Sequence, residues 1–311
     1  MRAVVFPGFG TAPEIRDDVD LPDPGEGEVR VRVHAASVNG FDLAVAAGMV
    51  QGMMEHRFPV VLGKDFAGAI DAVGPGADGY AVGDRVFGVV TKPFLGDGSF
   101  GEFVTVPVTV GLAKLPDSVS FTDGAALGLA GTAALDSVDA AELRPGQSVL
   151  IAGATGGVGS YAVQFAAQAG ATVIATAHTD EGRDLVTRLG AAEVVDYAGD
   201  VAAQVRASHP DGVDAVIHLA GDPVALLPAL RDGGRFASTV IMSAEQLPAD
   251  SATVAPVYAH PAPEKLDRLA EGSAQQHTLT SVEKVYPLTE ARQAFAHFGQ
   301  GTRGKLVLSL D

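Results

Sequence analysis

The sequence predicts an α/β fold of two domains, one built on a doubly wound parallel sheet of the Rossmann type and one rich in short β-strands. Residues 148–152 are an apolar, β-branched run, residues 153–159 are a glycine-rich turn, and a helical pattern follows without a break. Residues 1–115 hold many short strand-like segments that end at Gly or Pro, as in a small, partly open barrel. The 311 residues are enough for both domains.

Composition and charge exclude several kinds of function. Hydrophobic residues make up 47% of the chain, which suits a large core, but no run of about 18 apolar residues predicts a membrane span. A net charge of −17 repels phosphate backbones, so nucleic acid is not an expected partner. Residues 1–6 are typical of a first strand and not of a signal peptide, so we expect a cytoplasmic protein.

A metal site is also not expected. The chain has no cysteine, which removes disulfides, thiolate nucleophiles and any zinc site with a cysteine ligand. The eight histidines show no H-x-x-x-H or similar ligand spacing. We therefore predict that no resident metal takes part in the chemistry.

The predicted barrel begins with strands whose side chains alternate. Residues 28–34 alternate strictly, which turns the valines toward a core and leaves His34 on a solvated face. Shorter strand-like segments follow at 69–74 and 83–88, each ending at a glycine. These segments together predict the walls of the barrel.

Two segments of this N-terminal half bear on ligand binding. Residues 42–59 have weak helical character and contain Met49, Met53 and Met54. Methionine is an adaptable filler, so these side chains form either an apolar binding surface or ordinary core. Residues 121–141 are small and apolar at helical spacing, and a helix of such side chains can pack closely on a sheet or on a bound ligand.

The glycine-rich turn is predicted to bind a dinucleotide. In a strand–turn–helix unit, backbone N–H groups and the positive end of the helix dipole face a pyrophosphate. A glycine-rich turn can also be purely structural. Here a second strand follows at 171–176, and strands at 193–196, 214–220 and 235–241 alternate with helical segments. This context favours a cofactor-binding unit.

The C-terminal part is predicted to return to β-structure. Residues 263–270 are expected to form a helix and residues 278–286 a strand. Thr289 is a candidate N-cap for a final helix, and residues 306–308 are expected to close the chain as a last strand. No internal repeat or low-complexity segment interrupts this order.

Four segments match the pattern of one known superfamily. Residues 37–42 form an S-x-N-x-x-D segment, and residues 62–68 resemble a barrel signature. The turn 153–159 resembles the superfamily's glycine-rich turn, with Ala154 where the first Rossmann glycine usually stands. Residues 303–305, Arg-Gly-Lys, precede the last strand. Together these segments resemble the zinc-free quinone oxidoreductase (zeta-crystallin-like) branch of the medium-chain dehydrogenase/reductase superfamily.

The resemblance implies a domain arrangement and an assembly. A GroES-like barrel domain would comprise residues 1–118 and 273–311, and a Rossmann NADPH-binding domain residues 119–272, with the active site in the cleft between them. Members often pair their Rossmann sheets edge to edge, so the resemblance also implies a homodimer. Residues 252–259 would be the edge strand of this chain.

The departures from the zinc-dependent relatives bear on the substrate. Asn39 stands near the place of a Cys ligand, and Lys64-Asp65 stand where a His-Glu pair would fall. Without a Lewis acid, an unactivated ketone loses transition-state stabilisation, so we expect an acceptor that is already electrophilic. Some enoyl-thioester reductases carry a Tyr proton donor after the Asn, and residues 42–59 contain none, which favours a quinone.

The end of the second Rossmann strand predicts the cofactor. NAD sites usually place an acidic residue there, but this strand ends at Thr176, and Thr176, His178 and Arg183 are the side chains that can receive a 2′-phosphate. These residues favour NADPH. Asp180 and Glu181 argue for NAD, unless they only stabilise the start of a helix.

The resemblance also assigns individual site residues. Asn39 and Asp42 would lie beside the nicotinamide as catalytic residues, or else form a structural turn by side-chain bonding. Lys305, or Arg303, would reach the cofactor from the closing strand. The other predicted cofactor-binding residues are Thr132, Ala154, Thr155, Gly156, Gly157, Val158, Tyr197, Leu219, Ala220, Val240 and Ile241.

The expected function is hydride transfer from NADPH to a small electrophilic quinone or conjugated enone, with catalysis mostly by positioning and exclusion of water. One alternative is an enoyl (thioester) reductase, and another is a tailoring reductase for one metabolite. A third is a non-catalytic NADPH-binding protein, because the same cradle would serve it. No residue of the sequence is marked as the general acid.

Overall fold

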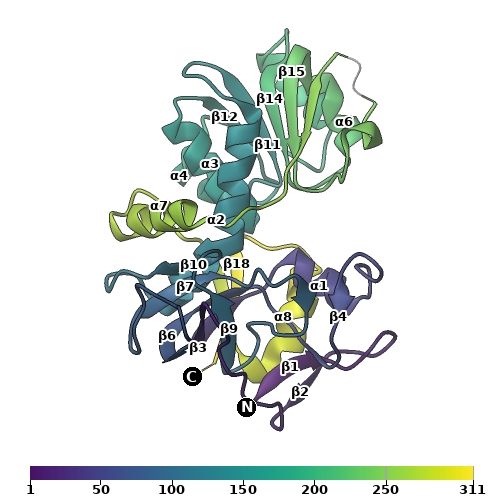
Figure 1. Cartoon of the computed structure of the whole chain (residues 1–311). Helices are drawn as coiled ribbons and strands as arrows, with labels where there is room; N and C mark the ends of the chain where they lie inside the picture. Colours follow the sequence, from purple (N-terminus) through teal and green to yellow (C-terminus); the bar gives the residue numbers. More distant parts are fainter. Residues whose placement is uncertain (249–250, 311) are drawn as a thin grey trace. The chain divides into compact units, whose positions relative to one another are not determined.

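The computed structural model describes residues 1–248 and 251–310. The chain divides into two compact units, Met1–Leu129 with Pro261–Asp311, and Ala130–His260. Figure 1 shows the C-terminal segment, in yellow, among the N-terminal strands of the first unit. The α/β class and the pairing of a barrel-like unit with a Rossmann unit are as predicted from the sequence.

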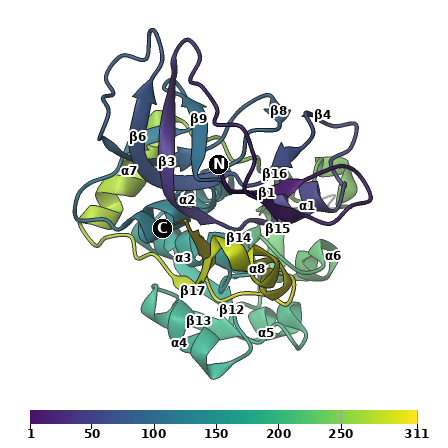
Figure 2. The same cartoon turned by 90° about the horizontal axis from the view of Figure 1, so that it is seen from below.

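The first unit is built mainly on one large, mostly antiparallel sheet. Its strands lie in the order β10-β7-β6-β3-β18-β17, and β9 also pairs with β3. Figure 2 shows β6, β3 and β9 side by side. The strands are β3 (Glu28–Ser37), β6 (Asp65–Val73), β7 (Arg85–Val89), β9 (Phe103–Pro107), β10 (Leu112–Lys114), β17 (Val282–Pro287) and β18 (Lys305–Ser309).

Smaller elements complete this unit. A three-stranded sheet has the order β2-β1-β5, and β4 pairs with β8. These short strands are β1 (Ala3–Phe6), β2 (Glu14–Arg16), β4 (Glu55–His56), β5 (Val60–Val61) and β8 (Phe94–Leu95). The helices are α1 (Gly40–Ala46), α7 (Pro263–Ala274), α8 (Ala291–Phe298) and the first part of α2 (Phe121–Ala141).

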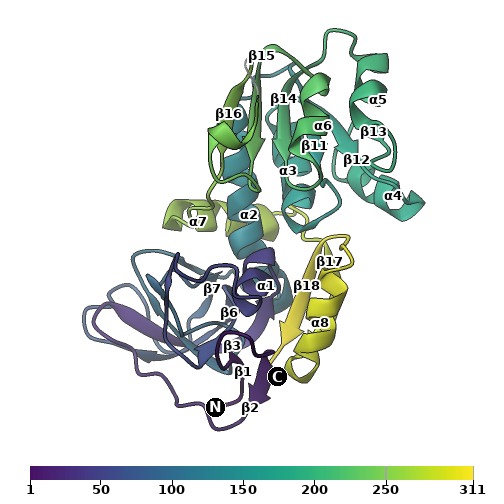
Figure 3. The same ribbon diagram turned by 90° about the vertical axis from the view of Figure 1, so that its right-hand side faces the viewer.

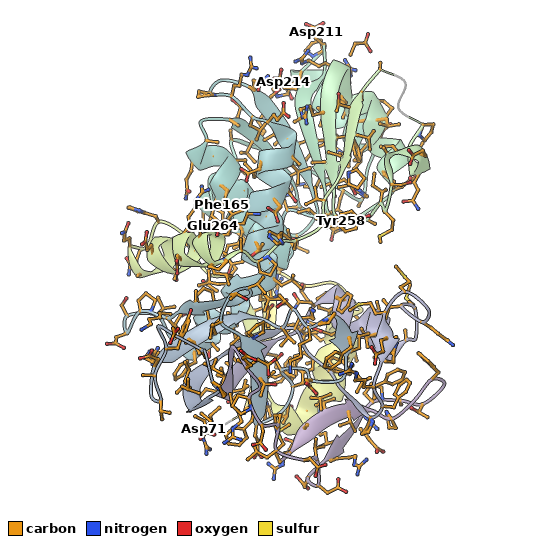
Figure 4. The ribbon with its side chains drawn as sticks, viewed as in Figure 1. Asp71, Phe165, Asp211, Asp214, Tyr258 and Glu264 are labelled. Atoms are coloured by element: carbon orange, nitrogen blue, oxygen red, sulfur yellow. The ribbon has the colours of Figure 1, made fainter. Side chains whose placement is uncertain are left out.

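The alternation of β3 forms the core as predicted. Val29, Val31 and Val33 are buried, while Arg30 points outward to an ion pair with Asp71 of β6, labelled in Figure 4 (N–O distance 2.7 Å). His34 lies on the outward face and is partly exposed. Its ring stacks on Phe121, at the first turn of α2, with centroids 4.6 Å apart.

The last strand brings a distant part of the chain into the barrel. β18 pairs antiparallel with β3, with Val307 opposite Ser37, and parallel with β17. Continuing this register places Lys305 opposite Asn39. The predicted cap at Thr289 is wrong: α8 begins after Glu290, without a side-chain cap, because residues 288–290 form a 3₁₀ turn first.

The second unit is a six-stranded parallel sheet of the order β13-β12-β11-β14-β15-β16 (Figure 3). The chain order reverses between β11 and β14, which is where ligands bind in doubly wound sheets. β16 is an edge strand, as predicted for residues 252–259. The strands are β11 (Ser148–Ala152), β12 (Thr172–Thr176), β13 (Glu193–Val195), β14 (Val213–His218), β15 (Leu230–Ser238) and β16 (Thr253–Pro256).

Helices alternate with these strands, which makes the sheet doubly wound. They are α3 (Gly157–Gln168), α4 (Asp180–Arg188), α5 (Val201–Ser208), the short α6 (Pro223–Leu226) and the second part of α2. At the amino ends of β11 and β14, the Asp214 carboxylate, labelled in Figure 4, accepts a hydrogen bond from the Ser148 N–H (2.9 Å). This bond fixes the end of the sheet opposite the glycine-rich turn.

The unit boundaries lie at 129/130 and 260/261, about eleven residues from those expected at 118/119 and 272/273. The first turns of α2 belong to the first unit because the Leu129 N–H donates to the Asp65 carboxylate (2.7 Å). A Cβ added at Gly124 would lie 2.9 Å from the Leu115 side chain, so the helix packs closely there. α7 packs against β10 and therefore also belongs to the first unit.

Candidate functional site

The glycine-rich turn joins β11 to α3 and requires its glycines for two different reasons. Gly153 has φ of +83°, a left-handed conformation that favours glycine. A Cβ at Gly159 would lie 2.1 Å from the Gly153 carbonyl oxygen, so α3 can approach the turn only if residue 159 has no side chain. The turn is therefore drawn tightly over the end of the strand, as a dinucleotide cradle needs.

The N-terminal end of α3 fits a pyrophosphate. Gly156 is the N-cap, and a Cβ there would meet only the Gly153 oxygen, at 3.4 Å, so the space in front of the helix is not filled by side chains. The first N–H groups of a helix have no acceptor within it and carry the positive end of the helix dipole. Thr155, Gly157 and Val158 are partly exposed around this end, whereas Ala154 is fully buried beneath it.

Thr176 supports the turn from the neighbouring strand. Its hydroxyl oxygen accepts a hydrogen bond from the Gly153 N–H (3.0 Å), and the side chain is only 2% exposed. The sequence had suggested that this hydroxyl receives a phosphate. The structure instead places it inside the protein, where it ties β12 to the turn.

His178 and Arg183, the other two predicted phosphate contacts, lie together at the surface. The His178 Nδ1–H donates to the Asp196 carboxylate (2.8 Å), and Arg183 lies 3.9 Å from the other oxygen of the same carboxylate. The Tyr197 ring is exposed, and its centroid lies 5.6 Å from that of His178. His178 and Arg183 are thus joined by Asp196, and Tyr197 is the next residue in the chain. These three residues were named from the sequence, but Asp196 was not.

A buried His–Ser pair shapes the loops on the other side of the turn. The Ser238 hydroxyl donates to His218 Nδ1 (2.8 Å), and His218 Nε2–H donates to the Gly221 carbonyl (3.1 Å). The Ser238 oxygen also accepts from the N–H groups of Val240 and Ile241. Burial lowers the pKa of His218, which favours the neutral ring that this arrangement needs.

These bonds position the predicted cofactor-lining residues at the carboxyl ends of β14 and β15. A Cβ at Gly153 would lie 3.0 Å from the Ala220 side chain and 3.3 Å from Leu219, so this loop lies directly beside the glycine-rich turn. Val240 is half exposed and Ile241 is buried. A His at the end of a strand and a Ser at the end of the next were the signal that sequence reasoning missed.

A second polar cluster lies inside the first unit, around Asp65 at the start of β6. One oxygen of the carboxylate, Oδ2, accepts from the Ser37 hydroxyl (2.6 Å) and the Asn39 amide (2.9 Å). The other, Oδ1, accepts from the Leu129 N–H. The Asp65 side chain is 0% exposed.

Lys305 supplies the buried cation of this cluster. Its Nζ donates to the Asn39 amide oxygen (2.6 Å) and to the Val38 carbonyl (3.2 Å), and lies 3.5 Å from Asp65 Oδ2. Burial lowers the pKa of Lys305, and the neighbouring carboxylates of Asp65 and Asp42 act in the opposite direction. Lys305 was predicted to reach the cofactor; here it is 4% exposed and held by Asn39 and Asp65.

Asn39 has every polar atom of its side chain engaged. The amide nitrogen donates to Asp65 and to the Ser37 carbonyl, and the amide oxygen accepts from Lys305. Between the two roles considered for Asn39, the hydrogen bonds favour a positioning role over direct contact with a substrate. Thr132 is likewise buried, on α2, and Arg303 is an exposed partner of Glu283.

Asp42 is a buried carboxylate at the edge of this cluster. It closes a capping box at the start of α1, where its carboxylate accepts from the Asn39 N–H (2.8 Å). Burial raises the pKa of Asp42 from 3.8 to about 7, helped by the charge of Asp65 and opposed by Lys305 and Lys64. A small cavity of about 20 Å³ is lined by Asp42, Lys64 and Phe94 among others, which is room for one water.

Lys64 also lines this cavity. In the sequence it was notable only because it stands where zinc-dependent relatives have a His-Glu pair. It follows Gly63, where φ is +103° and an added Cβ would lie 2.5 Å from Phe100, so the backbone at this point is fixed. Its Nζ lies 5.3 Å from the centroid of the Phe41 ring, and burial lowers the pKa of Lys64. Asp42 and Lys64 therefore line the same cavity, and burial shifts the pKa of each toward neutrality.

The methionines of residues 42–59 do not behave as one group. Met49 is 73% exposed and Met53 is 64% exposed, so ordinary core packing is wrong for these two. Met54 packs against the core. Within residues 1–248 and 251–310, no three His, Asp or Glu side chains are grouped so that they could hold a metal ion. In the same part of the chain no helix is long and apolar enough to cross a membrane.

Comparison with known proteins finds relatives along the whole chain. Residues 25–117 match the alcohol dehydrogenase GroES-like domain, and residues 157–257 match the zinc-binding dehydrogenase family. The chain is 30% identical to the quinone oxidoreductase of Homo sapiens, over 100% of this chain and 98% of the human one.

Two further similarities concern a solved structure and a larger protein. The structure of the quinone oxidoreductase from Coxiella burnetii superimposes with a TM-score of 0.89 at 26% identity, covering 100% of this chain and 99% of that one. A mycocerosic acid synthase-like polyketide synthase of Mycolicibacterium smegmatis is 38% identical over 68% of this chain, which corresponds to 10% of the synthase.

Proposed function

Because the chain belongs to the quinone oxidoreductase branch of the medium-chain dehydrogenase/reductase superfamily, we propose that it is a zinc-independent, NADPH-dependent reductase of quinones or conjugated enones. The observation that carries the proposal is the tight glycine-rich turn in front of α3, which fits a dinucleotide pyrophosphate. The reduced nicotinamide, when bound, supplies the hydride.

The residues of the chain do the binding and orienting. The first N–H groups of α3 hold the pyrophosphate, with Thr176 fixing the turn and the His218–Ser238 pair fixing the loops beside it. Arg183 supplies positive charge for a 2′-phosphate beside His178, which is why we propose NADPH and not NADH. Tyr197 offers an exposed ring beside them for the adenine.

The donor set of the barrel does not fit a catalytic zinc. Asn39 directs its amide N–H at Asp65, and the ammonium of Lys305 lies against the same carboxylate, so an added cation would be repelled there. Since these residues supply no Lewis acid, we propose an acceptor that is electron-poor by itself, such as a quinone or an enone. Asp42 and Lys64 are the groups placed to supply a proton to it.

An enoyl reductase is the second candidate, because part of a polyketide synthase is similar to this chain over 218 residues. Against it, residues 42–59 contain no Tyr to protonate carbon. A reductase for a single metabolite, or a non-catalytic NADPH-binding protein, would use the same cradle.

The test is oxidation of NADPH, followed by its absorbance, with 1,4-benzoquinone, 9,10-phenanthrenequinone, an alkyl enone and crotonyl-CoA as acceptors and NADH as the control donor. We expect turnover with the quinones, faster with NADPH. Turnover only with crotonyl-CoA would favour the enoyl reductase. NADPH binding without turnover on any acceptor would contradict the proposal as stated.

We also propose a homodimer that pairs the β16 strands of two copies. The support is that β16 is the edge strand of the sheet, and it carries no charged residue (Thr253–Pro256) to oppose pairing. Sedimentation would give the mass of two chains. A charged substitution at Val254 should then yield the mass of one chain.

A further inference from the structure

Asp196 lies beside the two residues that we propose to bind the 2′-phosphate of NADPH, His178 and Arg183. It follows β13 directly, and β13 pairs with β12 so that Val195 lies opposite Thr176. The carboxylate of Asp196 therefore stands next to the loop that follows β12. It is the common partner of His178 (2.8 Å) and Arg183 (3.9 Å).

This group adjoins the glycine-rich turn. A Cβ added at Gly182, the residue before Arg183, would lie 3.3 Å from the Thr155 side chain of the turn. Thr179 caps α4 by accepting from the Gly182 N–H (3.1 Å), which fixes the direction of the first turn of that helix. His178 and Arg183 thus lie next to the cradle, on the side of the second strand.

The position of the Asp196 carboxylate is fixed by its own loop. Its oxygen accepts from the Ala198 N–H (2.9 Å), and its backbone N–H donates to the Gln204 side chain (2.8 Å). The bonds from Ala198 and His178 hold the pKa of Asp196 below its ordinary value, although the side chain is partly exposed. The carboxylate stays charged and in place at neutral pH.

We propose that Asp196 sets the preference between NADPH and NADH by competing with a 2′-phosphate for His178 and Arg183. This inference rests on the proposed nicotinamide-dependent function. A 2′-phosphate brings about two negative charges to a place where Asp196 already balances the charge of Arg183 in part and holds the His178 Nδ1–H. NADH brings only hydroxyl groups, which can donate to a carboxylate without repulsion. Asp180 and Glu181, at the start of α4, add to the negative field.

The test is equilibrium binding of NADPH and NADH to the wild type and to Asp196→Asn, repeated with the fragments 2′,5′-ADP and 5′-AMP. Asparagine keeps an oxygen for the Ala198 N–H, so the loop should fold as before. We expect the affinity for NADPH relative to NADH to rise about tenfold, with the same change between the two fragments.

Asp200→Asn is the matched control. Asp200 lies four residues further along, where it caps α5 by accepting from the Ala203 N–H (2.9 Å), and asparagine is an equally good cap. It removes the same charge from the same loop without touching His178 or Arg183, so the ratio should change less than twofold.

Each outcome decides something different. An affinity for NADPH relative to NADH that is unchanged or lower in Asp196→Asn, with normal binding to the wild type, would overturn this inference alone. Asp196 would then only hold His178 and Arg183 in position. An equal rise in Asp200→Asn would also overturn it, because net charge and not this carboxylate would be responsible. Failure of both cofactors to bind the wild type would overturn the proposed function together with it.

Discussion

The glycine-rich turn of the second unit and the polar cluster of the first unit are built in opposite ways. The turn consists of backbone from one continuous segment, and its shape depends on side chains that are missing at Gly153 and Gly159. The cluster consists of side chains from β3, β6 and β18, with a backbone N–H from α2, and its charges balance only when all are present. We therefore expect the glycine-rich turn to tolerate substitutions around it but not at its glycines. The polar cluster should instead depend on each of its side chains.

The largest expected effect comes from adding one carbon to the turn. In Gly159→Ala the Cβ would lie 2.1 Å from the Gly153 oxygen, so α3 must move away from the cradle. The helix N–H groups would then no longer meet the pyrophosphate, and we expect NADPH affinity to fall about a hundredfold. Gly8→Ala is the control, because a Cβ there meets nothing within 4 Å. Circular dichroism separates lost binding from lost folding, and normal NADPH affinity in Gly159→Ala would contradict the description of the turn.

The next effect tests the dependence of the cluster on Lys305. Lys305→Met removes the buried cation that lies 3.5 Å from Asp65, and leaving a buried charge unpaired costs about 3–5 kcal/mol of unfolding free energy. Denaturant unfolding measures it. The exposed Lys284→Met should change little, and the double variant Lys305→Met/Asp65→Asn should recover part of the loss because both buried charges are gone. Equal stability of Lys305→Met and Lys284→Met would show that the cluster does not act as a unit.

These two regions also differ in how well they could be predicted. The strand–glycine–helix order lies within one short segment, so local pattern was enough to place the turn and the Rossmann sheet, while the edge strand β16 was expected from the family resemblance. The cluster joins residues up to 267 positions apart, as in the Lys305–Val38 bond, and the pattern of neither segment contains the register of β18 on β3. Lys305 was therefore assigned to the cofactor, and the roles of Asp65, Lys64, His218 and Asp196 were not found.

The domain boundaries show the same limit. α2 has a uniform pattern of small apolar residues along its length, so nothing local marks the point where Leu129 bonds to Asp65 and the helix passes from one unit to the other. Thr176 is a further case: at the end of a strand its hydroxyl can face a ligand or a neighbouring turn. The hydrogen bond from the Gly153 N–H shows that the Thr176 hydroxyl faces the turn.

A pH measurement sharpens the comparison, because only the side-chain cluster titrates. Asp42 has a pKa of about 7 in the folded protein and 3.8 as its ordinary value, so the folded state binds the proton more tightly than the unfolded state. Its contribution to stability is therefore fully present below pH 4 and is lost as the pH rises through 7. The slope is at most about 1.4 kcal/mol per pH unit.

Asp42→Asn, which keeps an acceptor for the Asn39 N–H, should lack this dependence. The measurement is unfolding free energy at pH 5, 6, 7 and 8 for the wild type, Asp42→Asn and the exposed control Asp78→Asn. We expect the stability advantage of the wild type over Asp42→Asn to shrink with rising pH and to level off above pH 8. Parallel curves for all three proteins would mean that Asp42 titrates normally and is not the proton-exchanging group of the site.

The smallest effect concerns the one side chain that supports the backbone-built turn. Thr176→Val keeps the shape of the residue but removes the acceptor of the Gly153 N–H, which costs about 1 kcal/mol. Because the glycines and the helix end remain, we expect NADPH affinity to fall only about threefold, and Thr176→Ser should restore it. A loss as large as that of Gly159→Ala would mean that the turn depends on its side-chain partner as strongly as the cluster depends on Lys305. The two sites would then obey the same rule, in which a single hydrogen bond from a neighbouring strand decides whether the backbone holds its conformation.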